Sequence, residues 1–367
     1  MDPASKIPVV LAPALRVDRA LSMDLYLVNL QAALAPYTDR FNFEVVAPPT
    51  VPGGSWASKQ WKRYIAYPRL LTRRLRARPG TVLHVLDHSY GHLCRDDVPT
   101  VLTCHGLENF RLKLRLPWQQ GLWTYRVRRM RLARRVLAIS ADAGEDIARF
   151  TATDPRRISV NYHGIEPVFS PDGGRFPALE ARRDAGELLV LHVGMNIARK
   201  NIGLLLDALA KLRAQGVPVR FVKVGSDPRQ DGYRAQMERL GLLDHFEYLG
   251  WLDAPALAAV YRSCHVLAFP SIHEGFGRPI IEAQACGLPV VVADTASARE
   301  IAGVGALIHA PTDADDLAAK TRAAAADPDT RADLRRRGFE NVRRFSWAEH
   351  ARVLTEIYAR LHADPRE

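Results

Sequence analysis

The stretch from residue 265 to residue 294 constrains the fold of this chain more than any other part. It contains a short apolar run, Val266–Phe269, of the kind that forms a strand buried on both faces of a parallel sheet. A glycine-containing loop follows, Pro279 marks the first turn of a helix, and Gly287 marks its end. Val290–Val292 then begin the next strand. This order of strand, loop, helix and strand predicts an α/β fold with parallel sheets.

The loop before the helix has the composition of a phosphate-binding site. Its glycines let the backbone approach a ligand, and the helix that follows directs unpaired N–H groups and a positive dipole end at one point. Glu274 lies in this loop and Glu282 lies within the helix. Because carboxylates repel phosphate, we expect Glu274 to accept a hydrogen bond from a sugar ring and Glu282 to accept one from a ribose. The alternative is a crossover helix with two solvated glutamates, but the whole string favours a nucleotide-sugar site, with Glu274, Gly275, Phe276, Gly277, Arg278 and Glu282 as its residues.

The string EGFGRPIIEAQACGLPVVVAD resembles the E-x7-E signature of retaining GT-B glycosyltransferases, in the large fourth family that includes bacterial mannosyl- and glucosyltransferases. The resemblance implies two Rossmann-like domains that face each other across a cleft, with a C-terminal helix that crosses back to the first domain. It implies hexose transfer from a nucleotide-diphosphate sugar with retention of configuration and without a metal or other cofactor. GDP-mannose is the donor favoured by family analogy, and UDP- and dTDP-sugars are alternatives. The implied acceptor is a polysaccharide, a lipopolysaccharide or a lipid-linked glycan.

A second strand that ends in a glycine and cations predicts another part of the same site. Gly194 follows an apolar run, and Arg199 and Lys200 directly precede a predicted helix, so a phosphate would meet both cations and backbone N–H groups. Lys200 matches a lysine of the family pattern, whereas Met195 stands where the family has an arginine. We therefore expect Arg199 to supply that missing charge. By the same resemblance, two further residues at strand ends, Gly225 and Gly250, flank the nucleotide base.

In the first half of the chain, histidines follow two predicted strands. In open α/β sheets, residues just past the carboxyl ends of the strands line ligand sites. Thr103-Cys104-His105 matches the Thr-x-His of the family, whose histidine lies near the transferred sugar. The resemblance therefore makes His105 a catalytic residue, together with Glu274 and Lys200. His88 is explained equally well as a structural hydrogen-bonding residue.

The length of 367 residues, of which 47% are hydrophobic, suits two globular domains. A segment rich in proline, glycine and charge divides the chain, and the last residues form an amphipathic helix. We predict four parts: an acceptor-binding domain (1–170), a linker (171–186), a nucleotide-sugar-binding domain (187–345) and a terminal helix that packs on the first domain (346–367).

The excess positive charge lies in the first half, where residues 1–185 carry 28 Lys and Arg against 17 Asp and Glu. The segments Lys59–Arg78 and Arg111–Arg135 alternate cations with aromatic residues. This composition suits an anionic membrane surface or a polyanionic acceptor, but also a solvated helix face. Because no apolar stretch is long enough to span a membrane and the N-terminus lacks signal-peptide features, we expect a cytoplasmic protein, with peripheral contact at the inner face of the cytoplasmic membrane if the basic segments bind lipid. Nucleic acid is not an expected partner.

Other chemistries lack support in the sequence. Asp313-Ala-Asp315 and Asp327-Pro-Asp329 match the letters of the metal-binding Asp-x-Asp motif, but neither follows an apolar strand. The four cysteines have no metal-ligand spacing, and the chain has no P-loop, dinucleotide fingerprint or nucleophile elbow. We therefore predict no metal site. Two alternatives to glycosyl transfer remain open, a GT-B sugar-nucleotide epimerase and a non-catalytic membrane- or polyanion-binding protein.

Overall fold

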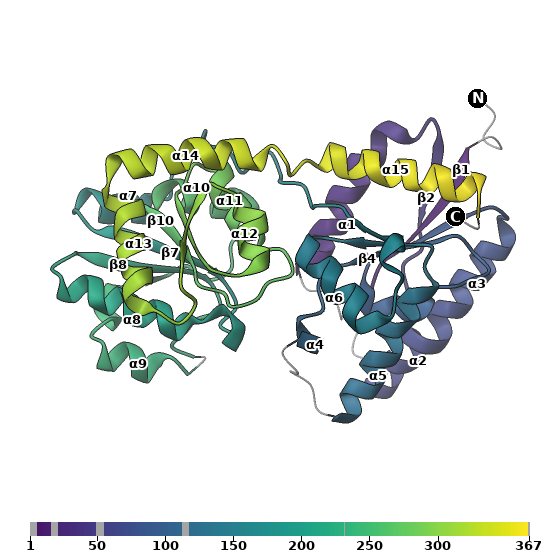
Figure 1. The fold of residues 1–367 in the computed structure, drawn as a ribbon, viewed down its shortest axis with the longest axis horizontal. Helices are drawn as coiled ribbons and strands as arrows, with labels where there is room; N and C mark the ends of the chain where they lie inside the picture. The colour runs from purple at the N-terminus through teal and green to yellow at the C-terminus, as the bar shows by residue number, and fades with distance from the viewer. Residues whose placement is uncertain (1–5, 16–20, 49–54, 112–116, 231, 366–367) are drawn as a thin grey trace. The chain divides into compact units, whose positions relative to one another are not determined.

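The computed structural model of the chain describes residues 6–15, 21–48, 55–111, 117–230 and 232–365. The chain divides into two compact units, one made of residues 1–164 and 346–367 and the other of residues 165–345. Each unit is a parallel sheet flanked by helices (Figure 1). Because the strands are apolar on both faces, helices must cover both sides of each sheet, as the sequence pattern predicts.

The N-terminal unit has a six-stranded parallel sheet in the order β2-β1-β3-β4-β5-β6. The direction of strand order reverses beside β1, so the loops after β1 and β3 flank a topological switch point, where open α/β sheets bind their ligands. The strands are β1 (Ile7–Ala12), β2 (Phe41–Val45), β3 (Val82–Val85), β4 (Thr100–Cys104), β5 (Arg135–Ala138) and β6 (Ile158–Val160).

The last helix of the chain, α15 (Trp347–Ala363), belongs to the N-terminal unit. It packs along α1 (Leu21–Leu34) and on β1 and β3, as Figure 1 shows. Leu354 and Leu361 join the same buried core as Leu30 of α1. The hydroxyl of Tyr358 is hydrogen-bonded to His84 Nδ1 at 2.6 Å, which ties the helix to β3. The N-terminal unit therefore needs both ends of the chain to complete its core.

The other helices of the N-terminal unit lie between its strands in sequence. Ser140 caps the last of them, because its hydroxyl accepts a hydrogen bond from the Ala143 N–H at 3.0 Å. These helices are α2 (Trp56–Trp61), α3 (Tyr67–Ala77), α4 (Glu108–Arg111), α5 (Pro117–Arg128) and α6 (Ala141–Thr151).

The C-terminal unit has a second six-stranded parallel sheet, in the order β12-β11-β10-β7-β8-β9. Numbered within the unit, this is the 3-2-1-4-5-6 order of dinucleotide-binding Rossmann folds. Its switch point lies between β7 and β10. The strands are β7 (Leu188–Gly194), β8 (Val219–Gly225), β9 (Phe246–Tyr248), β10 (Val266–Phe269), β11 (Val290–Ala293) and β12 (Ala306–His309).

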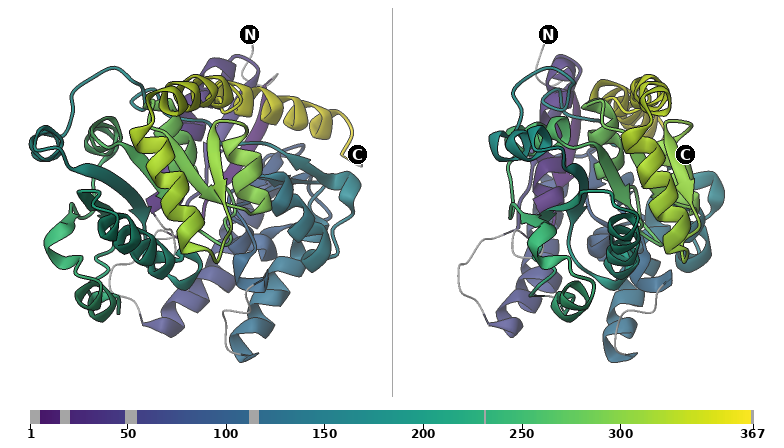
Figure 2. Two further views of the ribbon diagram at one scale, coloured as in Figure 1. Left: turned by 60° about the vertical axis from the view of Figure 1, so that its left-hand side comes forward. Right: turned by 90° about the vertical axis from the view of Figure 1, so that its left-hand side faces the viewer.

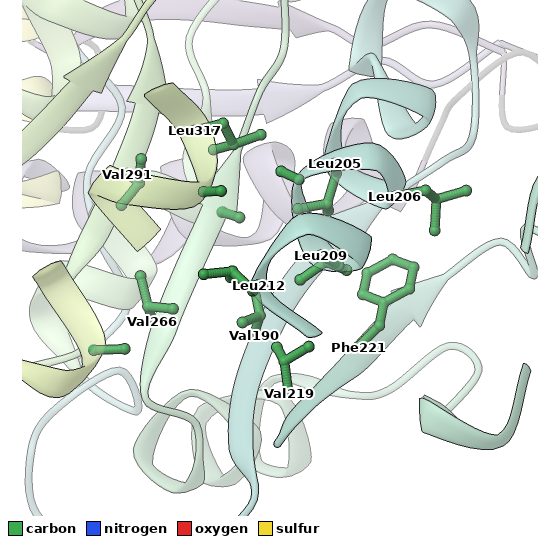
Figure 3. Close-up of a cluster of buried hydrophobic side chains, with 14 of the residues drawn as sticks. Val190, Leu205, Leu206, Leu209, Leu212, Val219, Phe221, Val266, Val291 and Leu317 are labelled. Atoms are coloured by element: carbon green, nitrogen blue, oxygen red, sulfur yellow. The ribbon is translucent and has the colours of Figure 1, made fainter. Parts of the chain in front are cut away.

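The core of the C-terminal unit fixes the helix that follows β7. Leu205 and Leu209 of this helix, α8, pack against Val190 and Phe221 of the sheet (Figure 3). Leu317 of α13 closes the same core, and α13 packs beside α8 (Figure 2). The helices of this unit are α7 (Pro177–Asp184), α8 (Ile202–Ala214), α9 (Arg234–Arg239), α10 (Ala254–Ser263), α11 (Arg278–Ala285), α12 (Ala296–Ala302), α13 (Ala314–Ala326) and α14 (Pro328–Val342).

The prediction that residues 171–186 form a linker is wrong. The division between the units falls after Gly164, and the segment carries α7 within the C-terminal unit. Leu179 of α7 is fully buried, and the Phe176 N–H donates to the Ser263 hydroxyl at 2.7 Å. The prolines and glycines that indicated a linker instead delimit a short helix, with Pro177 in its first turn.

Replacing Leu179 with alanine is therefore expected to destabilise the C-terminal unit. Truncating a fully buried leucine removes packing and leaves a cavity, which costs about 2–5 kcal/mol. Urea unfolding followed by circular dichroism would measure this loss. Ala178, which is exposed on the same helix, provides the control as Ala178→Ser. Equal stability of the two variants would show that α7 is not part of the folded core.

Candidate active site

Two loops of the C-terminal unit meet at the switch point between β7 and β10. The Ile272 N–H, after β10, donates to the carbonyl of Arg199, after β7, at 2.9 Å. The Arg199 guanidinium donates in return to the His273 carbonyl at 3.0 Å. These bonds join the two stretches in which the sequence predicts a phosphate site, and they place them where Rossmann folds bind nucleotides.

The centre of the site is a buried cluster of one carboxylate and two cations. Glu274 Oε2 lies 2.5 Å from Arg199 Nη1, and Glu274 Oε1 lies 2.6 Å from Lys200 Nζ. Burial acts to raise the pKa of Glu274, but the charges of Lys200 and Arg199 outweigh it and hold the pKa below its ordinary value. The carboxylate is thus ionised at neutral pH, and the cluster retains one net positive charge.

Lys200 is placed precisely by its surroundings. It ends a short 3-10 turn, Ala198–Lys200, directly before α8, and only 7% of the residue is exposed. Its ammonium lies 4.7 Å from the centre of the Phe269 ring, a cation–π contact that the end of β10 supplies. A buried lysine held in this way keeps its charge directed at one position.

Two helix N-termini at the switch point lack side-chain caps. Asn201, in left-handed conformation, precedes α8, and its side chain accepts no hydrogen bond from that helix; Gly277, with φ of 92°, precedes α11 and has no side chain. The first N–H groups of α8 have no intrahelical partner, so they add partial positive charge to that of Arg199 and Lys200. In α11, Pro279 has no N–H and the Ile280 N–H donates to the Gly277 carbonyl at 2.9 Å. The start of α8 is therefore suited to binding phosphate oxygens.

The three predicted strand-end glycines lie together. Gly194 and Gly225 are register partners on β7 and β8, and the Gly225 N–H donates to the Gly250 carbonyl at 2.8 Å. A Cβ atom on Gly225 would lie 2.3 Å from the Gly194 carbonyl oxygen. Gly225 also has a φ of 107°, a conformation that favours glycine. The backbone of β7 can therefore approach β8 closely at this point only because Gly225 lacks a side chain.

Glu282, on α11, lies in a second buried network. The Tyr261 hydroxyl donates to Glu282 Oε2 at 2.9 Å, and Arg278 Nε lies 3.2 Å from Oε1. Arg278 also pairs with Glu166 at 2.5 Å. Burial raises the pKa of Glu282, although Arg278 and Tyr261 partly offset this. Each carboxylate oxygen has a second lone pair, so these contacts leave Glu282 able to accept a further hydrogen bond.

Two buried residues beneath the loops were not predicted from the sequence. Lys223, on β8, is fully buried and donates to the carbonyls of Gly194 and Val224, the latter at 2.9 Å. His192, on β7, is also fully buried, and its pKa is lowered first by burial and then by Lys223 and Lys200. A signal was available for His192, which is a basic residue inside an otherwise apolar strand, whereas the strand of Lys223 also contains Arg220. Lys223 adds a positive charge directly behind the glycine that ends β7.

His105 lies in the N-terminal unit, directly after β4. Its Nε2 atom donates to the Leu86 carbonyl at 2.8 Å, so the neutral ring has an unprotonated Nδ1. Among the described residues, that buried Nδ1 has no hydrogen-bond partner. His88 Nδ1 accepts a long hydrogen bond, 3.4 Å, from the His105 N–H and lies 3.8 Å from Asp87, so it contacts the same loop. His105 thus presents an acceptor suited to a substrate hydroxyl.

His105 is expected to stay neutral across the physiological range. Burial lowers its pKa to about 4, and Asp87 and the Leu86 carbonyl only partly offset this. Stability from the neutral ring is present above the unfolded pKa of about 6.5 and is lost as the pH falls toward 4. In an NMR titration, the His105 ring signals should not shift between pH 5.5 and 8. A midpoint near 6.5 would contradict the burial of this ring, and His105→Gln identifies the signal.

The basic and aromatic segments of the N-terminal unit are only partly on the surface. Trp56 and Trp61 are exposed, as are Lys59 and most arginines of α3. Tyr67 and Trp123, however, are buried, so these two rings belong to the interior and not to a surface. No helix within the described ranges is long and apolar enough to cross a membrane.

Among the described residues, no group of three or more His, Cys, Asp and Glu side chains could hold a metal ion. Glycosyl transfer without a metal remains a prediction.

Two family models match most of the chain. Residues 180–341 match "Glycosyl transferases group 1", and residues 25–169 match "Glycosyltransferase Family 4". Similar proteins include the D-inositol 3-phosphate glycosyltransferase of Segniliparus rotundus, 32% identical over 61% of this chain and 51% of that protein. Another is the O-antigen chain mannosyltransferase B of Escherichia coli, 31% identical over 59% of this chain and 58% of that protein. The matches thus span little more than half the length of these relatives.

Solved structures share the fold across almost the whole chain. A sucrose-phosphate synthase from Thermosynechococcus elongatus has a TM-score of 0.79 at 20% identity, covering 98% of this chain and all of that one. HepE from Anabaena, solved in complex with UDP and glucose, has a TM-score of 0.75 at 19% identity, covering 97% of this chain and all of that one. Two Rossmann-like units, an E-x7-E loop at a switch point and these matches lead to one conclusion: the chain belongs to the family 4 glycosyltransferases of GT-B fold.

Proposed function

We propose that this protein transfers a hexose from a nucleotide-diphosphate sugar to a glycan acceptor with retention of configuration. The observation that carries the proposal is the buried cluster of Glu274, Arg199 and Lys200 between two uncapped helix N-termini at the switch point. A diphosphate fits this arrangement because it would meet cations and N–H groups from two sides.

The cations would stabilise the leaving group. As the bond from the sugar to the nucleoside diphosphate breaks, negative charge develops on the phosphate oxygens. Lys200, Arg199 and the N–H groups at the start of α8 are fixed before the reaction, so they need little reorganisation to stabilise that charge. Lys223, behind Gly194, adds to the same field. In this role the cations replace the divalent ion that other transferases use.

The carboxylates would orient the donor. Glu274 would accept a hydrogen bond from the transferred sugar while its own charge is balanced by Arg199 and Lys200. Glu282 would accept one from the ribose, which requires it to keep or exchange the Tyr261 contact. His105, with its unprotonated Nδ1, would accept a hydrogen bond from a hydroxyl of the substrate. None of these groups is assigned as a covalent nucleophile.

The relatives favour a mannosyl donor and a surface-glycan acceptor. Several similar proteins are named as mannosyltransferases, including the serotype-specific mannosyltransferase WbdA of Escherichia coli, so we propose GDP-mannose as donor. UDP-glucose is the alternative, because it is bound in the solved HepE structure. Acceptors would be a polysaccharide, a lipopolysaccharide or a lipid-linked glycan. The exposed Trp56, Trp61 and neighbouring cations support peripheral contact with an anionic membrane on the cytoplasmic side.

A thermal-shift panel of GDP-, UDP- and dTDP-sugars tests the donor. A ligand stabilises the folded state by RT ln(1 + [L]/Kd), so the preferred nucleotide should raise Tm most. Transfer is then assayed with that donor, with and without EDTA, and the anomer of the product is identified by NMR. No shift with any of the three nucleotide sugars would refute the donor site. An isomerised donor without an acceptor would indicate an epimerase.

A further inference from the structure

A cavity of about 100 Å³ lies in the C-terminal unit, at the sheet edge opposite the candidate active site. His265, directly before β10, and Pro289, directly before β11, both line it. They mark the amino ends of strands whose carboxyl ends face the Glu274 loop. Because strand β10 has four residues at about 3.3 Å each, more than about 13 Å of sheet separates the two places.

Five arginines line this cavity, and they come from separate elements of the unit. Arg175 precedes α7, Arg183 lies on α7, Arg262 lies on α10, and Arg331 and Arg335 lie one turn apart on α14. Segments distant in the sequence therefore bring their cations to one point. No single helix face or run of charge accounts for this arrangement.

Few carboxylates balance this charge. Arg175 pairs with Glu180 at 3.2 Å, and Arg262 donates to the carbonyls of Gly174 and Ser170. In the part of the chain that the structure describes, no carboxylate lies within ion-pairing distance of the other three guanidinium groups, those of Arg183, Arg331 and Arg335. Like charges that gather around a cavity repel one another, so the arrangement favours an anion inside it.

The protonation state of His265 is consistent with a positively charged cavity. Its Nδ1 accepts the Leu189 N–H at 3.0 Å, so the neutral ring carries its proton on Nε2, which is a donor. Burial and, after it, the charges of Arg183, Arg331 and Arg175 together lower the pKa of His265 to about 4. The pKa of Arg183 is also lowered, first by burial and then by Arg175.

We propose that this cavity binds the phosphate group of a small phosphorylated molecule. Guanidinium groups bind phosphate oxygens in bidentate pairs, and several of them around one point match a tetrahedral dianion better than a planar carboxylate. The cavity has room for one such group. The rest of the ligand would extend into solvent.

The cavity is connected to the candidate active site through one side chain. Tyr261 lines the cavity, and its hydroxyl donates to Glu282 at 2.9 Å. A bound phosphate next to Tyr261 would thus lie one residue from the second glutamate of the E-x7-E signature. The binding site itself does not depend on the proposed glycosyl transfer.

The test is calorimetric titration of the full chain with inorganic phosphate and with glucose 6-phosphate, at constant ionic strength set by chloride. The pocket variant is Arg331→Gln with Arg335→Gln. The matched control is Arg336→Gln with Arg337→Gln, which removes the same charge from the same helix at residues that do not line the cavity. Lys200→Ala is titrated in parallel because it weakens phosphate binding at the candidate active site.

We expect the pocket variant to weaken phosphate binding at the cavity at least about tenfold, and the control to leave it within about twofold. Lys200→Ala should weaken only the binding at the candidate active site, so the binding that remains in this variant is assigned to the cavity. Phosphate should also raise the pKa of His265 in an NMR titration, because a nearby anion favours the charged ring. Tighter binding of glucose 6-phosphate than of phosphate would identify a sugar phosphate as the ligand, and equal binding would identify the free ion.

The proposal would be overturned if the phosphate binding that remains in Lys200→Ala were unchanged after the two pocket substitutions are added, or if Lys200→Ala alone abolished all binding. Equal weakening in the pocket and control variants, or no binding at millimolar phosphate, would also overturn it. If the double variant does not fold, Arg335→Gln alone, at an exposed residue, takes its place.

Discussion

Replacing Lys200 with alanine is expected to lower kcat by about two to three orders of magnitude. The ammonium is buried, fixed over the Phe269 ring and directed at the point where leaving-group charge would develop. Removing one such preorganised group costs a factor of about 10²–10³. Steady-state kinetics with the donor selected by thermal shift would measure the loss. Lys211→Ala, on the exposed side of the same helix, is the control and should keep normal turnover.

The cluster around Glu274 should also behave as one unit. Glu274→Ala leaves two neighbouring cations without their carboxylate, so it is expected to lower both kcat and Tm. Because each variant disrupts the same contacts, the double variant Lys200→Ala, Glu274→Ala should lose less than the product of the single effects. Near-normal turnover of either single variant, with an unchanged Tm, would refute the assignment of this site.

Gly225→Ala is expected to be the most destabilising single change at the strand ends. The new Cβ would lie 2.3 Å from the Gly194 carbonyl oxygen, and the φ of 107° is itself unfavourable for alanine. Together these should cost about 3 kcal/mol or more, which lowers Tm by about 6–12 °C in a unit of this size. Differential scanning calorimetry would measure this, and binding of the donor nucleotide should weaken because the loop after β7 must move.

Gly216→Ala is the matched control for this substitution. Gly216 also has a positive φ, 80°, but a Cβ there would meet no atom within 4 Å. It should therefore lose only the conformational preference of glycine, about 1 kcal/mol. A similar loss in both variants would show that the close approach of β7 and β8 is not what requires glycine at residue 225.

Local sequence patterns were sufficient for the elements that carry the site. Apolar runs delimited β10 and β11, Pro279 and Gly287 marked the two ends of α11, and the cations before α8 indicated the second loop. Each of these signals acts within a few residues, so it can be recognised without knowing the rest of the fold. The predicted linker failed because the same prolines and glycines also delimit α7, and only the burial of Leu179 distinguishes the two cases.

Features that depend on contacts between distant segments were not predictable. The pairing of Arg278 with Glu166 joins residues more than a hundred positions apart, and the arginine cavity gathers charge from α7, α10 and α14. The complete burial of Lys223 likewise follows only from the fold, in which both faces of β8 are covered. In each case the chemistry is set by which elements the topology brings together, and that information is not present in any single stretch of sequence.

The return of α15 to the N-terminal unit has a consequence for the order in which the protein is made. The C-terminal unit is one continuous segment, so it can fold as soon as residue 345 has left the ribosome. The N-terminal unit, although translated first, exposes the apolar surface that α15 covers until residues 347–363 have been synthesised. A nascent chain would therefore carry a finished C-terminal unit and an incomplete N-terminal unit, and chaperones would have most to protect in the part that was synthesised earliest.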